Sequence, residues 1–391
     1  QREMCIRDRT LAVESRMNPQ AQYGADVIMR ANYALEHGTE ALSMCVRKAV
    51  NEMLGSLAED AGIRREDVFQ VCVVGNTCMH HLFLGISPAS LVHAPYIPAV
   101  SERLVLNAGD YGLAVQERAE LIMLSDIAGY VGADTCGCLL AIRQDQQEEI
   151  SLMIDIGTNG EMVLGNRERM VTCSTAAGPA FEGAKIECGM RGAAGAVDHV
   201  KYEDGKWNYT TVGNKPAVGL CGSGLIDLVA GLLDAGMLDE NGVLRSGQEK
   251  QGVFILVPPE RGGNERGVYL TQKDLGEVQL AKAAIAAGIQ MLMERLGITE
   301  DDICSVYIAG AFGNYMDPVS AGKIGLLPAT LVKKVKPVGN AAGEGAKIAL
   351  VNEKEMLEMD ELVRKIEFVE LAASADFQDH FIDELGFETG E

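Results

Sequence analysis

The residues best suited to chemistry lie in one short segment, residues 155–161, between two apolar runs. The chain runs from the apolar residues 152–154 through an acid-glycine-hydroxyl turn to the apolar residues 162–164. This pattern predicts a strand, a tight turn and a second strand. The glycines let the backbone approach a bound group closely and aim several N–H donors into one concavity, which suits a phosphate. Asp155 can hold a hydrated magnesium ion beside them. The turn is not a P-loop, because no Gly-Lys-Ser/Thr follows and a strand comes next instead of a helix.

Two later segments give this turn a context, since an Asp-x-Gly hairpin turn alone is more often only a turn. Residues 305–309 form an apolar strand that opens into a glycine-rich loop, and residues 338–346 introduce an alanine-rich helix. In this order, the three features resemble the nucleotide cleft of the actin, sugar-kinase and heat-shock-chaperone ATPase superfamily. The resemblance implies an α/β, two-lobed, actin-like (ribonuclease H-like) ATPase fold with a nucleotide cleft between the lobes.

A closer resemblance lies in the combination of several segments, namely residues 15–20, 23–28, 74–82, 130–134, 177–183, 221–227 and 376–379. Together they are similar to the ATPase domain of the reductive activators of corrinoid proteins, from about Leu11 to the C-terminus. Members of that family use ATP to drive an electron onto an inactive Co(II) corrinoid and restore Co(I) for methyl transfer. The resemblance implies ATP and Mg²⁺ as cofactors, a corrinoid protein of a methyl-transfer system as partner, and a role in anaerobic metabolism.

The same resemblance assigns candidate site residues. Asp155 and Glu182 are the expected catalytic residues: Asp155 binds Mg²⁺ through water, and Glu182 orients the attacking water or binds the metal. The expected nucleotide contacts are mostly glycines and small polar residues, namely Gly157, Thr158, Asn159, Gly160, Asn76, Thr77, Gly222, Ser223, Gly224, Gly310, Ala311, Phe312 and Gly343.

Several of these assignments have a purely structural alternative. Asn76 and its neighbour are equally suited to cap the helix that follows them. Glu182 can be a solvated carboxylate at a helix start, where the helix dipole favours negative charge. Residues 222–224 either contact the nucleotide at a helix N-terminus or only cap that helix. His80 and His81 suit packing and hydrogen bonding more than proton transfer.

The elements that position these residues follow from hydrophobic periodicity and turn signals. Residues 23–54 read as helical, and a strand at residues 69–74 leads to a helix at residues 79–84. Two hairpins are expected in the second half, one pairing residues 161–164 with 170–173 and one pairing 196–202 with 207–212. Helices are expected from Gly222 and from Thr271, the second with a capping box at Asp274 and an end at Gly297.

The chain is expected to have four parts. Residues 1–10 are interpreted as a non-native or misassembled leader, and residues 11–150 as a first ATPase lobe that lacks its first strands. Residues 151–340 form the second lobe, and residues 341–391 a closing helix and a tail that returns to the first lobe. Family members carry another aspartate-glycine-threonine turn and a plant-type ferredoxin domain upstream, so the ATPase is expected to be impaired and the iron-sulfur cluster to lie outside this chain.

Composition excludes some classes of function. The chain has 391 residues, 47% of them hydrophobic, which is enough for two lobes, and a formal net charge of −22, which argues against binding nucleic acid. No apolar run reaches the roughly 18 residues of a membrane span. The ten cysteines include a pair, Cys136 and Cys138, spaced too tightly for a zinc or iron-sulfur motif. Free thiols in this number indicate a reducing compartment, the cytoplasm.

Two functions of other classes stay open. A small-molecule kinase of the same superfamily needs a general-base aspartate, for which Asp126 and Asp134 are candidates. An actin-like or chaperone-like ATPase would form nucleotide-dependent polymers or bind peptides. The sequence leaves open the corrinoid protein, the methyl donor, the electron donor, the oligomeric state, a homodimer included, and whether the chain folds and hydrolyses ATP.

Overall fold

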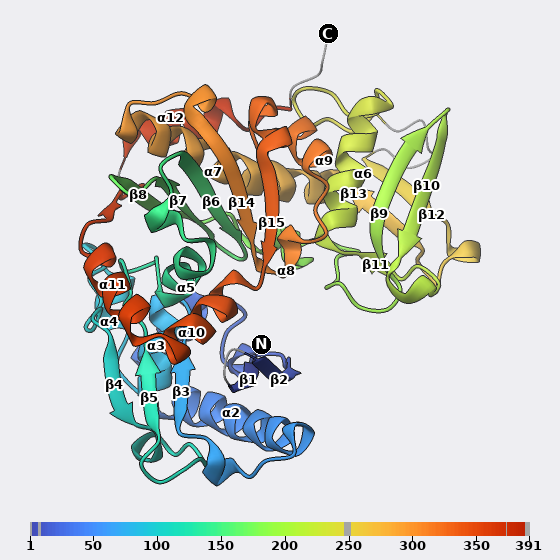
Figure 1. Cartoon of the computed structure of the whole chain (residues 1–391). Coiled ribbons are helices and arrows are strands. Elements are labelled where there is room, and N and C mark those ends of the chain that lie inside the picture. The colour runs from blue at the N-terminus through green and yellow to red at the C-terminus, as the bar shows by residue number, and fades with distance from the viewer. Residues whose placement is uncertain (1, 7–8, 246–251, 373, 388–391) are drawn as a thin grey trace. The chain divides into compact units, whose positions relative to one another are not determined.

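The computed structural model describes residues 2–6, 9–245, 252–372 and 374–387, and the chain divides into two units (Figure 1). The first unit comprises Gln1–Glu148, Asn166–Met170 and Asn340–Phe368, and the second comprises Glu149–Gly165, Val171–Gly339 and Val369–Glu391. Gln1, Arg7 and Asp8 of the expected leader, and residues 388–391 of the expected tail, lie outside the described residues. Within the described ranges, no helix is both long and apolar enough to cross a membrane.

The second unit is built on a sheet with the strand order β15-β14-β6-β7-β8 (Figure 1). The predicted strand-turn-strand is confirmed, because β6 and β7 are antiparallel neighbours. Asp155 on β6 lies opposite Glu161 on β7 and Ala309 on β14, to which β6 is parallel. The chain therefore leaves β6 and β14 at the same edge of the sheet. The strands are β6 (Ile150–Ile156), β7 (Gly160–Gly165), β8 (Met170–Thr175), β14 (Ile303–Ala309) and β15 (Val335–Gly339).

Helices α6 (Gly222–Asp234) and α7 (Gln272–Leu296) provide much of the core of the second unit. α7 begins and ends as predicted: Thr271 and Asp274 form a capping box, and Gly297 ends the helix with a φ of 70°. The predicted second hairpin is confirmed as the antiparallel pair β9–β10. The remaining elements are β9 (Ala196–Glu203), β10 (Lys206–Thr211), β11 (Gly219–Leu220), β12 (Val253–Val257), β13 (Val268–Thr271), α8 (Gly310–Gly313), α9 (Pro318–Lys323) and α12 (Ala375–Asp383).

The first unit contains a sheet in the order β3-β5-β4, with β3 parallel and β4 antiparallel to β5. Val50 and Leu54 of α2 are buried in the core formed with Leu121 and Met123 of β5. β3 and β4 are the edge strands, and an apolar groove of about 470 Å³ runs along β3 between α2 and α10. The elements are β3 (Gln70–Val73), β4 (Leu104–Asn107), β5 (Glu120–Met123), α2 (Glu40–Ala61), α3 (Thr77–Leu84), α4 (Ala89–Val92), α5 (Ala133–Ile142), α10 (Ala341–Val351), α11 (Glu353–Val363) and β16 (Glu367–Phe368).

The start of the first unit differs from the expected pattern. Residues 23–54 are not one helix: α1 (Val27–His37) ends at Gly38, whose φ is 84°, and α2 begins two residues later. The positive φ at Gly38 breaks the helical hydrogen-bond pattern at little cost only because glycine has no Cβ. Before α1, β1 (Arg2–Ile6) and β2 (Arg9–Glu14) form an antiparallel pair.

Two glycines let α5 and α10 cross closely within the first unit. A Cβ on Gly345 of α10 would lie 1.8 Å from the carbonyl oxygen of Gly137 on α5. A Cβ on Gly137 would in turn lie 2.6 Å from the carbonyl oxygen of Ala342. Because no side chain fits at either position, the two helices approach backbone to backbone.

Candidate functional site

The predicted turn between β6 and β7 is a compact backbone loop. The N–H of Gly157 donates to the carbonyl of Asn159 at 2.9 Å, and the carbonyl of Thr158 accepts from Gly178 at 2.8 Å. The second bond ties the turn to the loop that follows β8. Asp155, the last residue but one of β6, is partly exposed at the start of this loop. The sequence thus placed the acid and the turn correctly within the sheet.

Glu182 lies against the same turn. Its Oε1 accepts a hydrogen bond from the Thr158 hydroxyl at 2.8 Å, and it would lie 3.6 Å from a Cβ on Gly157. Glu182 is the last residue of the short 3-10 helix Pro179–Glu182, directly before Gly183, so the helix-start position of the structural alternative is not confirmed. The structure instead gives this carboxylate a specific partner in the turn. Two acidic residues, Asp155 and Glu182, therefore lie at one loop.

The glycine-rich loop after β14 comes to the same place. Gly310 has a φ of 86°, and a Cβ there would lie 2.9 Å from Oδ1 of Asp155. A larger residue at this position would crowd the carboxylate and strain the backbone. Phe312 of α8 stacks on Phe181, with ring centroids 5.6 Å apart and ring planes 14° apart. Ala311 also lies in α8.

The N-terminus of α6 packs against these elements. Its glycines and its serine hydroxyl make packing contacts and a hydrogen bond within the protein. A Cβ on Gly222 would lie 2.0 Å from the carbonyl oxygen of Phe181, and one on Gly224 would lie 2.2 Å from that of Val197. The buried Ser223 hydroxyl donates to the carbonyl of Asp198 at 2.8 Å. Both glycines thus permit close packing, and nucleotide contact by residues 222–224 stays a prediction.

The turn residues Asn159 and Gly160 complete the group in the second unit. The Asn159 amide donates to Glu161 at 3.3 Å. Gly160 is buried, and a Cβ there would lie 2.9 Å from the hydroxyl oxygen of Thr175 and 3.2 Å from Ile285. Gly160 therefore lets the turn pack on α7, and its backbone position fixes where β7 begins.

Three predicted contacts belong to the first unit, and their side chains cap or pack helices there. Asn76 accepts a hydrogen bond from Cys78 N at 3.0 Å and caps α3, as the structural alternative proposed. Thr77 is fully buried, and its hydroxyl donates to the carbonyl of Ala128 at 2.7 Å. Gly343 lies under the capping side chain of Asn340, which would meet a Cβ at 2.2 Å. A nucleotide contact here would have to use backbone groups or the remaining atoms of Asn76.

The first unit also holds a buried ionisable cluster whose pairing the sequence did not indicate. Nδ1 of His80 lies 3.2 Å from Oδ1 and 3.3 Å from Oδ2 of Asp126, and Asp126 also accepts from Ala133 N at 2.9 Å. Burial alone would lower the pKa of His80, but the hydrogen bond and the charge of Asp126 outweigh it and raise that pKa. Burial, followed by the charge of Asp126, raises the pKa of Asp134 to about 6. Asp126, a candidate kinase base, is therefore occupied by His80.

The pKa of the adjacent His81 is shifted in the opposite direction from that of His80. Its Nδ1 lies 2.8 Å from the carbonyl of Thr77, and its Nε2 lies 3.0 Å from Ala99 N, which can only donate. The ring is therefore neutral with its proton on Nδ1, and burial lowers its pKa. The packing function expected for this histidine fits these contacts.

The donor set in the second unit fits a magnesium ion. Asp155 and Glu182 offer carboxylate oxygens, the ligand type that Mg²⁺ prefers, and Mg²⁺ in nucleotide sites takes its other ligands from water and phosphate. In the described part of the chain, no group of three or more His, Cys, Asp or Glu side chains is placed to enclose a metal. The residues therefore suit a metal that arrives with a phosphate ligand better than one fully enclosed by protein.

Two protein-family models and a curated relative are similar to this chain. The family model "C-terminal domain of RACo the ASKHA domain" matches residues 149–391, and the model "RACo middle region" matches residues 5–147. The corrinoid activation enzyme RamQ of Eubacterium limosum is 35% identical over 386 residues, which are 94% of this chain and 65% of that protein.

Two more proteins give the same picture. The [Co(II) methylated amine-specific corrinoid protein] reductase of Methanosarcina barkeri is 27% identical over 94% of this chain and 71% of its own length. A solved structure, "Reductive activator for corrinoid,iron-sulfur protein", superposes with a TM-score of 0.88 and 37% identity, over 97% of this chain and 62% of that one. The chain thus spans about two thirds of the length of these proteins. The expected actin-like α/β fold is confirmed by these matches.

Proposed function

Because the chain belongs to the family of the C-terminal ASKHA domain of RACo, we propose that it is an ATPase that couples ATP binding and hydrolysis to the reduction of Co(II) to Co(I) in a corrinoid protein. The names of its relatives support this: one is a corrinoid activation enzyme and another a reductase of a Co(II) corrinoid protein. The partner is a corrinoid protein of a methyl-transfer system. The nine cysteines from Cys45 to Cys304 are free, which supports a cytoplasmic location.

The observation that carries the proposal is the convergence of Asp155, Glu182 and Gly310 on the turn after β6. Magnesium bound with ATP would supply charge neutralisation for the phosphates. Asp155 would hold this ion, and Glu182, fixed by the Thr158 hydroxyl, would orient the attacking water. The backbone N–H groups of residues 158–160 bind the phosphate oxygens, while the N–H of Gly157 holds the turn by donating to Asn159. Work is done on the partner only if nucleotide states of the protein bind it with different affinities.

The test is magnesium-ATP hydrolysis by the full chain and by Asp155→Ala, each with and without a Co(II) corrinoid methyl-transfer protein. We expect the corrinoid protein to stimulate hydrolysis, and the variant to lose turnover while its melting temperature stays within a few degrees of the parent's. Asp383→Ala, an exposed acid at the end of α12, is the matched control and should hydrolyse ATP normally. Full ATPase activity of Asp155→Ala would contradict the assignment of the site. A rate of hydrolysis that does not change when the corrinoid protein is added would contradict the proposed partner.

A further inference from the structure

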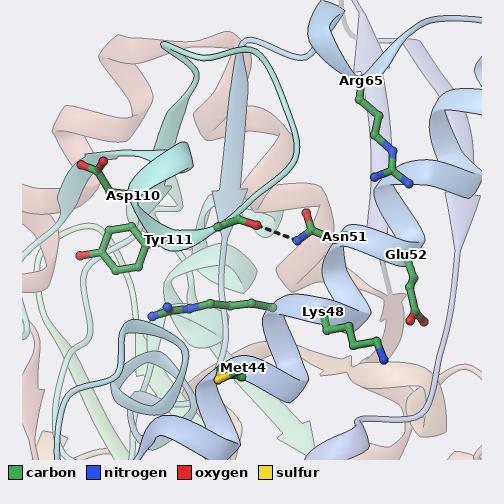
Figure 2. A pocket seen from close by; sticks show the side chains of 9 residues that line it. Met44, Lys48, Asn51, Glu52, Arg65, Asp110 and Tyr111 are labelled. Carbon is green, nitrogen blue, oxygen red and sulfur yellow. Dashed lines mark hydrogen bonds between the residues drawn. The ribbon is translucent and has the colours of Figure 1, made fainter.

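A second feature of the first unit lies outside the residues assigned to ATP. It is an open hollow of about 560 Å³ (Figure 2). One side is formed by successive turns of α2, and the others by the short 3-10 helices Arg65–Asp67 and Ala108–Tyr111. Its lining residues are Met44, Arg47, Lys48, Asn51, Glu52, Arg65, Asp110, Tyr111 and Gly112.

The walls of the hollow are held together by hydrogen bonds. The Asn51 amide donates to the carbonyl of Gly112 at 2.7 Å, the bond drawn in Figure 2, and its Oδ1 accepts from Ala114 N at 2.7 Å. Arg47 donates through Nε to the carbonyl of Phe83 at 2.8 Å, and its guanidinium carbon lies 5.0 Å from the centroid of the Tyr111 ring. An arginine fixed in this way has already lost much of the side-chain entropy that binding would otherwise cost.

The hollow is basic within an acidic chain. The protein has 56 acidic against 34 basic residues, yet three cationic side chains, Arg47, Lys48 and Arg65, line this one hollow. Of its two acids, Glu52 is already ion-paired with Arg16 at 2.7 Å. Lys48 is exposed, and no ion pair is recorded for it or for Arg65 among the described residues. With Glu52 engaged by Arg16, the three cations outnumber the one remaining acid, Asp110, and this excess of positive charge is available to a ligand.

Residue types and shape favour a protein as that ligand. Arginine, tyrosine and methionine are enriched in the centres of protein interfaces, and Met44 is 62% exposed here. A hollow this open does not enclose a small molecule as ligand pockets do. Three cations are fewer than the clusters that bind acidic membranes. A second copy docked about a twofold axis would set these cations against themselves.

We propose that this hollow is a docking surface for a partner protein that presents carboxylate side chains. The acidic partner is steered to it by charge, and Arg47, Tyr111 and Met44 supply the contact area. The surface acts independently of the nucleotide site, so loss of docking leaves basal ATP hydrolysis unchanged.

The experiment uses a fluorescein-labelled polyglutamate peptide as the probe and fluorescence anisotropy of the full chain. We expect saturable binding that weakens with added salt and that falls about tenfold in Lys48→Glu/Arg65→Glu. The matched control is Lys354→Glu/Arg364→Glu, which makes the same charge change at exposed positions of and just after α11, outside the hollow. Absence of saturable binding, or equal weakening by both double variants, would overturn the proposal.

A covalent readout needs no variant and therefore does not depend on folding of the charge-reversed protein. A carbodiimide activates a carboxylate, and the deprotonated amine of a lysine in contact with it forms the amide while a urea leaves. After coupling with the polyglutamate probe, mass spectrometry should find the peptide on Lys48 in preference to Lys273, an exposed lysine at the start of α7. Coupling at Lys273 to the same extent as at Lys48 would contradict a defined docking surface.

Discussion

The Thr158 hydroxyl is the clearest link between the phosphate turn and Glu182. Thr158→Val removes the donor and keeps the shape, so the Glu182 carboxylate loses one charge-assisted hydrogen bond, a loss of about 1.5–3 kcal/mol in positioning. We expect ATP hydrolysis to fall about tenfold or more. Steady-state rates of Thr158→Val and Thr158→Ser make the comparison, because serine retains the hydroxyl and should keep most of the activity. Equal rates in the two variants would show that this hydroxyl does not position Glu182.

Asp134 makes the stability of the first unit depend on pH. Its folded-state pKa of about 6 lies above the ordinary value of 3.8, so the folded protein holds this proton more tightly than the unfolded chain does. The carboxyl group therefore costs no stability below pH 3.8, and its cost grows as the pH rises to 6 and is complete above it.

Asp134→Asn removes that cost, and its advantage over the parent should grow between pH 4 and pH 7. The measurement is the free energy of unfolding of both proteins by denaturant across this pH range. A difference that stays constant with pH would mean that Asp134 is not desolvated in the folded protein.

Residue identity and spacing were enough to find the turn of Asp155, because its pattern is local. They were not enough to find the partners of buried charges. His80 and Asp126 are 46 positions apart in the sequence. The residue pattern around either one does not indicate that their side chains are in contact. Lys282 appears in the sequence as one cation on a helix, yet it is 2% exposed and lies 5.4 Å from the ring of Phe387 near the C-terminus. Such pairs depend on tertiary packing, which periodicity does not encode.

At the scale of elements, the crossing of α5 and α10 rests on missing side chains. Gly345→Ala would place a methyl group 1.8 Å from the Gly137 carbonyl oxygen, so one helix must shift. We expect a loss of about 1–3 kcal/mol or more in the free energy of unfolding. The matched control is Gly276→Ala in α7, where nothing lies within 4 Å and the higher helix propensity of alanine should stabilise by about 0.5–1 kcal/mol.

Denaturant unfolding of both alanine variants decides the point. If Gly345→Ala lowers the free energy of unfolding and Gly276→Ala raises it, backbone contact sets the crossing of α5 and α10. If both variants are stabilised, the two helices do not approach as closely as Gly137 and Gly345 indicate.

Among the elements themselves, capping signals were the most reliable guide. The start of α7 at Thr271 and its end at Gly297 follow from side-chain and backbone chemistry that is local to the helix. The break between α1 and α2 was missed because apolar spacing continues across it, while Gly38 and Thr39 are also compatible with a helix interior. A glycine is only a weak signal until its φ is known.

For the whole molecule, the free edge of β3 and the groove beside it are a liability in solution. Phe69, just before β3, lines that groove and is 65% exposed. We expect the chain to self-associate through this edge, and faster in high salt, since salt screens the repulsion of a net charge of −22. Phe69→Lys should slow aggregation in light scattering with little change in melting temperature. Equal aggregation rates for the parent protein and Phe69→Lys would mean that the chain self-associates through another surface.

The position of β3 in the chain has a further consequence during synthesis. Val73 pairs with Met123, fifty positions later, so β3 leaves the ribosome well before β5 exists. At about 5–20 residues per second, both sides of β3 stay bare for roughly 3–10 s. Only α2, made earlier, is there to cover one face of the strand. Slower translation lengthens this interval, so the yield of native protein should depend on chaperones that bind extended apolar chain.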